Sequence, residues 1–425
     1  MVKTRAGDAA IYGVIIGSSL AISIINLAGS LRVLDISGSP VYLSLSVTLY
    51  NLAFTLMSWS WTRIFVGRLN RRGILLLSLV GISISLLLLI LGVGIYVVII
   101  GNTLAGLFSA LIYPVMITLL TDYLGRDSIA ITKYNMASGV GLALGYLLGG
   151  TLRMVLGPEW VLISTLVVTV ALIPLTLAIP QRYVIIEPRR ISYVSLIPQF
   201  TGRLRPAPSV IFTPRIMYNF GKMIIGAKKI LMSKLTRRMP LTLLGSTILF
   251  TGIALYFTPM PAYLRNLGFT DTFLYFTYLA STVVSILAYR PAHEKITSPE
   301  DAWKTLLLFT SSRILIFGAT PLFTLMVNEV SVKVAGIALY VFIGLTWSFI
   351  SSALPRVILS MSEFERREER LGHLNASIGV GTIIGSLISA YTLNLVGYEG
   401  TFIIASVLAL ISVITFMKAY RTLIT

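Results

Sequence analysis

The chain has 425 residues, of which 56% are hydrophobic and only 12% are charged, and its mean hydropathy is +0.88. Soluble domains carry about a quarter charged residues, so this composition excludes a water-soluble globular protein. The net charge of +18 would indicate nucleic-acid binding in a soluble protein, but a membrane protein holds such charge at its cytoplasmic face. The absence of cysteine excludes disulfides and thiolate chemistry, and two histidines leave little room for a histidine metal site. The composition therefore predicts an integral membrane protein that binds no nucleic acid.

Twelve apolar stretches are long enough to cross the membrane, which requires about 20 apolar residues for about 30 Å of hydrocarbon. Lys3 and Arg5 precede the first stretch as in a signal peptide, but its length and the lack of a small-residue cleavage site favour a retained helix. The least distinct boundary is the glycine-rich Leu91–Gly94. The predicted spans are 9–29, 40–62, 73–91, 95–120, 135–156, 160–179, 241–263, 271–290, 302–326, 333–355, 374–396 and 400–418.

The distribution of basic residues supports this topology. With the N-terminus inside, all but five of the 34 Lys and Arg fall in cytoplasmic segments. Lys and Arg near the ends of spans resist translocation, and an odd number of spans would place many of these basic residues on the outer side. We expect a multi-pass plasma-membrane protein with both termini in the cytoplasm. The exceptions are Arg32, Arg153, Arg265 and Lys333 on the outer side and Arg313 within span nine.

The sequence repeats itself once. The pattern N-x3-G-V-G-x3-G-x-L begins at Asn135 and again at Asn375, and the pattern L-R-x-L-x7-Y begins at Leu31 and again at Leu264. Because each half holds an even number of spans, the halves share one orientation, as a parallel repeat. We predict an all-α membrane protein with an N-terminal six-helix bundle (1–180), a basic cytoplasmic linker (181–240) and a C-terminal six-helix bundle (241–425).

The linker is strongly basic. Pro180–Pro240 contains twelve Lys or Arg and one acid, Glu187. Between Ile216 and Leu231 apolar side chains fall on one helical face and basic ones on the other. This pattern predicts an interfacial helix on the anionic inner leaflet, where each basic residue contributes about 1 kcal/mol. A solvated linker that only follows the charge rule is the alternative.

The loop after span two reads G-R-L-N-R-R-G from Gly67 to Gly73. It looks like a shortened G-x-L-x-D-R-x-G-R-R loop of the Major Facilitator Superfamily of secondary transporters, which the chain resembles over nearly its whole length. Such a loop pairs basic side chains with carboxylates and carbonyls at neighbouring helix ends and latches one conformation. The acid is absent here, with Asn70 nearest its place. The gating candidates are Gly67, Arg68, Arg71, Arg72, their alternative acidic partner Asp122, and Arg126 and Arg366, which are related by the repeat.

Span five contains three glycines spaced four residues apart and a fourth directly after them. It resembles the family pattern G-x-x-x-G-P-x-x-G-G, with Tyr146 in place of the proline. In the family this pattern is associated with exporters. Small residues on one face let helices approach closely and slide, which is also their generic role. These candidates are Gly141, Gly145, Gly149 and Gly150, with Gly381 and Gly385 at the same spacing in the second half.

The predicted spans contain no acidic residue, since all sixteen Asp and Glu fall in loops or at helix ends. Proton-coupled transport usually needs an embedded carboxylate or histidine. Where many proton-coupled relatives carry an arginine four residues before a glycine, this chain has Asn102 before Gly106. The coupling ion is open: a proton would use a peripheral acid, and uniport or exchange are the alternatives. The peripheral acids are Asp8, Asp35, Asp122 and Asp271.

The resemblance implies a substrate cavity lined by the first and fourth helices of each half, with additions from the second. Apolar walls with a few hydrogen-bonding groups suit a small organic molecule. Arg313 is embedded in span nine, where it either binds an anionic substrate or has a structural role. The substrate-binding candidates are Asn26, Asn51, Asn102, Tyr113, Tyr256, Tyr278, Tyr340, Trp347 and Arg313.

The sequence thus predicts a secondary transporter that works by alternating access and exports small amphipathic or apolar organic molecules. Uptake or exchange of a polar or anionic metabolite is the first alternative, and a membrane sensor that uses the linker as its output is the second. Enzymatic function is not expected, because no cluster of catalytic carboxylates, histidines or metal ligands is visible. No nucleotide-binding P-loop occurs either, so we expect no cofactor and no ATP-driven transport.

Overall fold

A computed structural model of the chain describes residues 5–65, 70–124, 127–179, 238–326, 328–361 and 367–421. The regular structure within these ranges is entirely helical. Four of the predicted gating residues lie outside the described residues, as does nearly all of the linker, and the side chain of Asp122 is not described. The four are Gly67, Arg68, Arg126 and Arg366.

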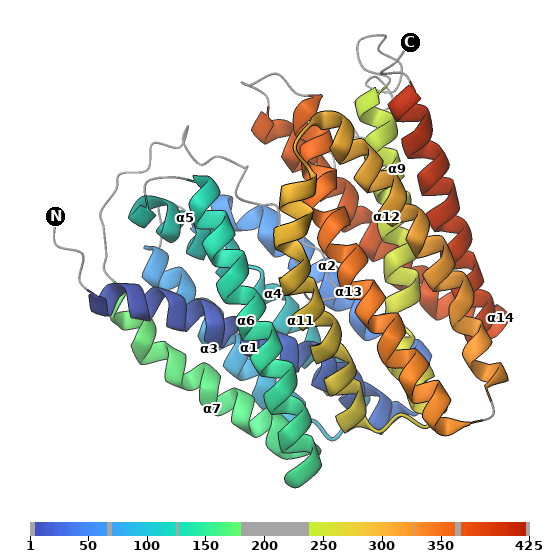
Figure 1. The fold of residues 1–425 in the computed structure, drawn as a ribbon. Coiled ribbons are helices and arrows are strands. Elements are labelled where there is room, and N and C mark those ends of the chain that lie inside the picture. The colour runs from blue at the N-terminus through green and yellow to red at the C-terminus, as the bar shows by residue number, and fades with distance from the viewer. Residues whose placement is uncertain are drawn as a thin grey trace.

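The N-terminal half of the described chain forms seven helices and the C-terminal half six, together with a short 3-10 helix (Figure 1). The first half contains α1 (Arg5–Ser37), α2 (Pro40–Phe65), α3 (Arg71–Leu91), α4 (Ile95–Ser109), α5 (Ile112–Leu124), α6 (Asp127–Val155) and α7 (Pro158–Leu177). The second half contains α9 (Arg238–Phe257), α10 (Met260–Asn266), α11 (Asp271–Lys295), α12 (Pro299–Ala319), η3 (Thr320–Leu325), α13 (Glu329–Ser360) and α14 (Arg367–Arg421).

Eleven helical segments of the described chain are long and apolar enough to cross a membrane, and the last of them makes two crossings. Along α9, residues 247–251 contact residues 381–385 of α14 in the same order, whereas residues 245–252 contact residues 405–412 in the reverse order. The chain therefore turns back at Gly397, whose φ of 70° breaks α14. With this reversal the predicted twelve-span architecture is confirmed.

Proline explains two breaks that the span prediction did not contain. The fourth span consists of α4 and α5, and the seventh of α9 and α10. Pro114 lies in the first turn of α5, and Pro259 and Pro261 lie at the start of α10. A proline has no N–H to donate to the preceding turn, so the helix is interrupted just before it. The boundary predicted at Leu91–Gly94 is confirmed, because α3 ends at Leu91 with Gly92 as its C-cap, and Gly94 is the N-cap of α4.

The two halves repeat one close helix contact. A Cβ at Gly141 of α6 would lie 2.3 Å from the carbonyl oxygen of Ile16 in α1, and one at Gly381 of α14 would lie 2.4 Å from that of Thr247 in α9. Such backbone contact is available only to glycine. The same approach recurs one turn later, at Gly145 and Gly385. These four of the predicted glycines therefore pack the fifth span of each half on its first span.

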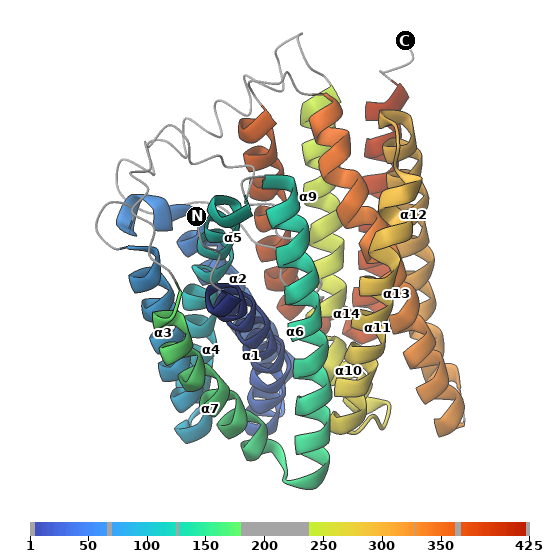
Figure 2. The ribbon, with the colours of Figure 1, turned by 60° about the vertical axis from the view of Figure 1, so that its left-hand side comes forward.

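The halves lie side by side, and α6 and α11 run along each other between them (Figure 2). A second contact joins α2 to the first part of α14. We call the end of the bundle where α7 ends and α9 begins the linker face. We call the opposite end, where the chain turns at Gly157 and Gly397, the distal face.

Candidate functional site

Four charged side chains from four helices meet at the distal face. Asp35 of α1 and Arg153 of α6 come from the N-terminal half, and Arg265 of α10 and Asp271 of α11 come from the C-terminal half. Arg265 donates Nε to Asp271 Oδ1 at 2.6 Å and Nη2 to Asp271 Oδ2 at 2.7 Å. Its Nη2 also lies 2.8 Å from Asp35 Oδ1, while Arg153 pairs with Asp271 and lies 3.9 Å from Asp35. We call these four residues the distal ion cluster.

Each member of the distal ion cluster lies at or near the end of its helix, so the cluster joins the two halves at their distal ends. Asp271 is the first residue of α11, where the partial positive charge of the helix N-terminus favours a carboxylate, and Thr270 caps that helix. The cluster is half-buried, with side-chain exposures from 11% for Asp271 to 30% for Asp35. Charged hydrogen bonds in such a site are stronger than between neutral groups. The cluster therefore holds the distal ends of the two halves together.

Aromatic side chains fill the α6–α11 contact beneath the cluster. Tyr275 packs on Gly149, where a Cβ would lie only 2.5 Å from the tyrosine ring. Tyr146 meets Tyr278 across the two halves with ring centroids 5.6 Å apart, and Tyr278 meets Tyr340 of α13 at 5.0 Å. We call Tyr146, Tyr275, Tyr278 and Tyr340 the tyrosine layer. All four are at least 98% buried, so this layer closes the space between the halves below the ions.

The sequence prediction included only part of this site. Asp35 and Asp271 were expected as peripheral acids, and Tyr278 and Tyr340 as substrate-binding residues that the structure brings into contact. Arg153 and Arg265 appeared only as exceptions to the charge rule. A signal existed, because the repeated L-R-x-L-x7-Y pattern contains Arg265 and the tyrosine of the layer at position 275.

Several other predicted candidates lie within one half. Tyr113 packs edge-on against Tyr134 at 4.8 Å, and Trp347 packs edge-on against Phe250 at 6.0 Å. Asn26 of α1 is half-buried. Binding of substrate by these residues stays a prediction.

Arg313 is fully buried inside the C-terminal half. Its Nη2 donates to the carbonyl oxygen of Ile343 in α13 at 3.1 Å, and its guanidinium lies 6.0 Å from the ring centroid of Phe317. The neighbouring Tyr256 stacks on the same Phe317 ring at 4.2 Å and shares a 2.7 Å hydrogen bond with Thr320. These contacts tie α12 to α13 and α9, which supports the structural alternative for Arg313.

Two asparagines of the N-terminal half differ in their surroundings. Asn102 of α4 donates Nδ2 to Ser46 of α2 at 2.7 Å, and a Cβ at Gly29 of α1 would lie 3.1 Å from its Oδ1. It therefore joins three helices. Asn51 of α2 is 3% exposed, and neither its Nδ2 nor its Oδ1 has a hydrogen-bond partner within the described chain.

The loop that resembles a family latch caps two helices. Asn70, which stands near the missing acid, accepts a hydrogen bond from Gly73 N at 2.7 Å and so caps α3. Arg72 donates to the carbonyl of Ile179, just beyond the end of α7. Pairing of this loop with a helix-end carbonyl is thus present, while Arg71 is half-buried.

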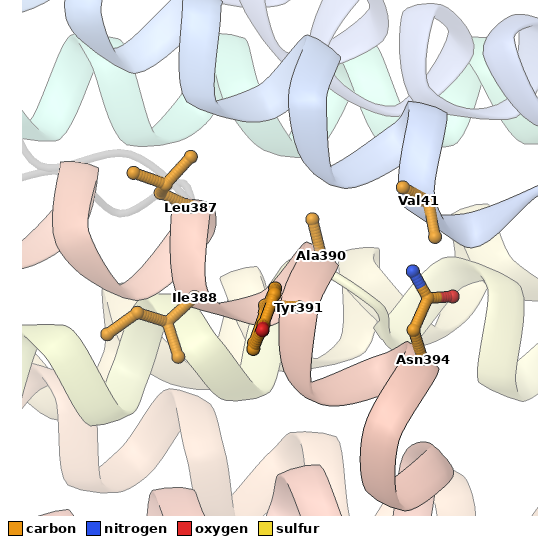
Figure 3. A pocket seen from close by; sticks show the side chains of 6 residues that line it. All are labelled: Val41, Leu387, Ile388, Ala390, Tyr391 and Asn394. Atoms are coloured by element: carbon orange, nitrogen blue, oxygen red, sulfur yellow. The ribbon is translucent and has the colours of Figure 1, made fainter.

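A groove of about 440 Å³ lies between α2 and α14 towards the distal face (Figure 3). It adjoins the point where Ser44 of α2 and Ser389 of α14 approach at 3.3 Å. Its walls are almost wholly carbon, so it offers little for a polar ligand. Figure 3 shows Asn394 and Val41 facing each other at one end. The lining residues are Val41, Leu387, Ile388, Ala390, Tyr391 and Asn394.

The comparisons with known proteins agree with this architecture. The sequence profile of the Major Facilitator Superfamily matches residues 11–360 and 314–423. Two crystal structures of the nucleoside transporter NupG, one of a mutant, superpose with TM-scores of 0.73 and 0.69 at 10% identity, covering 97% and 98% of this chain and 100% of theirs. The human organic anion transporter MFSD10 (TETRAN) superposes with a TM-score of 0.56 at 14% identity, covering 98% of this chain and 100% of its own.

No curated protein matches the sequence itself. At these identities the structural likeness shows the fold, and the profile match shows the family. The predicted fold class and the expectation of a transporter rather than an enzyme are thereby confirmed. The chain is a multi-pass membrane transporter and belongs to the Major Facilitator Superfamily.

Proposed function

We propose that this chain moves small amphipathic organic molecules by alternating access, with the distal ion cluster as its outer gate. The positive-inside rule supports an outward-facing distal face, because the basic linker joins the opposite ends of the two halves. In this orientation the described conformation is closed towards the outside. Rocking of one half against the other would break the cluster and open the outer side.

The observation that carries this proposal is the asymmetry of the ion pairs between the halves. Within the described ranges, the pairs that join the two halves all lie at the distal face. The described pairs outside the cluster, Arg290–Glu294, Lys304–Glu300 and Lys333–Glu329, each lie within one helix. Ion pairs that can break and re-form at one end of the molecule suit a transporter that closes first one side of the membrane and then the other.

The chemistry of the space between the halves supports an amphipathic substrate. The tyrosine layer offers flat apolar rings with hydroxyl groups, and α2 contributes a stripe of buried polar residues. Binding pockets for small organic molecules combine apolar walls with a few polar groups in this way. The stripe consists of Ser44, Thr48, Asn51, Thr55 and Ser58.

Export is favoured by the exporter-like glycine pattern of α6. Uptake or exchange of a polar or anionic metabolite is the second candidate, favoured by the likeness to a nucleoside transporter and an organic anion transporter. Reconstitution into liposomes with an internal pH dye and a defined orientation separates these modes when transport is coupled to protons, because a compound that enters in exchange for protons raises the internal pH and one that enters together with protons lowers it. Proton movement that depends on added compound would show coupling, and flux without it would indicate uniport, exchange or another ion.

The gate is tested by a reversible cross-link, for which the absence of native cysteine is an advantage. The double variant Arg153→Cys/Asp271→Cys places two thiols where the halves meet. Oxidation is expected to abolish flux, and reduction is expected to restore it. Each single variant is the control, since it cannot cross-link within one chain. Undiminished flux in the fully oxidised double variant would show that the distal contact does not open during transport.

Binding of anionic lipid by the basic linker is also part of this proposal. Deletion of residues 200–235 is expected to weaken association with anionic vesicles and to leave flux intact. If neither the unaltered protein nor the deletion variant shows flux, and the deletion removes a signalling output, the membrane sensor is favoured instead.

A further inference from the structure

The side chain of Asn51 is buried in the middle of α2 and, within the part of the chain that the structure describes, makes none of the hydrogen bonds that an amide can make. It lies eleven residues into α2, or about 16 Å along the helix from its distal end. Both polar atoms are inaccessible, and neither has a partner in the described chain. Buried amides are satisfied in the great majority of native sites, so an unsatisfied one calls for a specific explanation.

The position of Asn51 on α2 directs it towards the contact between the halves. Residues seven apart lie on the same helical face, which places Asn51 two turns from Ser44. Ser44 contacts Ser389 of α14 at 3.3 Å. Tyr50 and Ser46, which lie on another face of α2, contact Ser109 and Asn102 of α4 instead. Asn51 therefore belongs to the face of α2 that meets the opposite half.

The repeat shows that the fold itself does not require an amide here. A Cβ at Gly106 of α4 would meet the carbonyl of Tyr50, and a Cβ at Gly344 of α13 would meet that of Ser281. This packing equates Tyr50 with Ser281, and hence Asn51 with Thr282. The sequence repeat that pairs Tyr42 with Tyr275 would instead equate Asn51 with Val284, which carries no amide either. Thr282 donates to the Tyr278 carbonyl of its own helix at 2.8 Å and is satisfied locally. The amide is thus peculiar to one half.

We infer that the amide of Asn51 binds the transported molecule, and that this molecule presents a neutral planar edge with a hydrogen-bond donor beside an acceptor. Nδ2 donates and Oδ1 accepts, so the complementary groups are carboxamides and the amino-substituted edges of heterocyclic bases. Occupation by such an edge would satisfy both atoms at once. This inference rests on the proposed function, because it places a ligand between two halves that separate.

The first test needs no ligand. If Asn51 serves only as a substrate contact, Asn51→Leu keeps the branched shape of the side chain and removes an unsatisfied amide, so the melting temperature of the purified protein stays equal or rises. Asn102→Leu is the matched control, since it removes a hydrogen bond to Ser46, and a fall of about 2 °C or more is expected. An equal fall in the two variants would show that Asn51 is structural and would overturn the inference.

The second test uses three compounds that carry the edge and three that do not. 9-Methyladenine, 1-methylcytosine and nicotinamide are added at millimolar concentration, beside their N,N-dimethyl derivatives, in which no N–H donor remains. We expect at least one of the three edge compounds to raise the melting temperature of the unaltered protein. Its dimethyl derivative should leave the melting temperature unchanged, and the Asn51→Leu variant should show no shift with the edge compound. No shift with any edge compound, or a shift retained by Asn51→Leu, overturns the assigned ligand class.

The two proposals fail separately. If cross-linking of the distal ion cluster leaves flux intact while Asn51-dependent binding is present, the gate is wrong and the ligand site stands. If cross-linking blocks flux but Asn51→Leu binds and transports normally, the gate stands and the assignment of Asn51 is wrong.

Discussion

The substitution Asp271→Asn gives the sharpest test of the distal ion cluster. Asp271 accepts from both arginines of the cluster, and its side chain is 11% exposed. Removal of its charge leaves Arg153 and Arg265 with Asp35 alone. A hydrogen bond to a charged group contributes about 1.5–3 kcal/mol. Partial exposure screens the cluster, so we expect the closed state to lose about 2 kcal/mol, which is about a 30-fold shift towards the open state.

The shift is measured by the rate at which a buried cysteine reacts. Ser389→Cys introduces a nearly isosteric thiol at a fully buried position between α2 and α14. A membrane-impermeant maleimide added from the distal side reaches it only when the halves separate there. The labelling rate is expected to rise about 30-fold when Asp271→Asn is added, because the open fraction sets the rate.

Glu399→Gln is the matched control, since it removes an exposed carboxylate close to the same face but outside the described ion pairs. It is expected to leave the labelling rate unchanged. If Asp271→Asn behaves like this control, the cluster does not hold the distal side closed and the reasoning fails. If the control accelerates labelling equally, the effect is one of overall surface charge.

Three further predictions concern the fold. Gly141→Leu forces a side chain against the Ile16 carbonyl and is expected to destabilise the protein by about 3 kcal/mol, whereas Val140→Leu at an exposed position costs little; thermal unfolding compares them. Arg313→Ala is expected to lower thermal stability and to impair transport of neutral and anionic compounds alike; selective loss of anion transport would assign it to the substrate. Gly397→Ala is expected to cost about 1–2 kcal/mol, since its φ of 70° disfavours a Cβ, and a neutral effect on unfolding would contradict this.

The membrane topology could be predicted because hydropathy and positive charge report on each segment separately. The span boundaries, the repeat and the close-packing glycines need no knowledge of distant contacts. The distal ion cluster does need it, because its four members are separated by up to 236 positions between Asp35 and Asp271 and meet only when four helix ends converge. Composition cannot separate Asn51 from Asn102 either, since the difference lies in the serine that one of them contacts.

The two halves divide the charges of the distal ion cluster evenly, and this division determines how the membrane voltage acts on the opening of the gate. Asp35 and Arg153 move with one half, and Arg265 and Asp271 move with the other. Each pair is neutral, so separation of the halves carries no net charge through the field. Moving one elementary charge across 100 mV involves about 2.3 kcal/mol, and this gate avoids that work in either direction. The opening of the outer side should therefore proceed equally in energised and depolarised membranes.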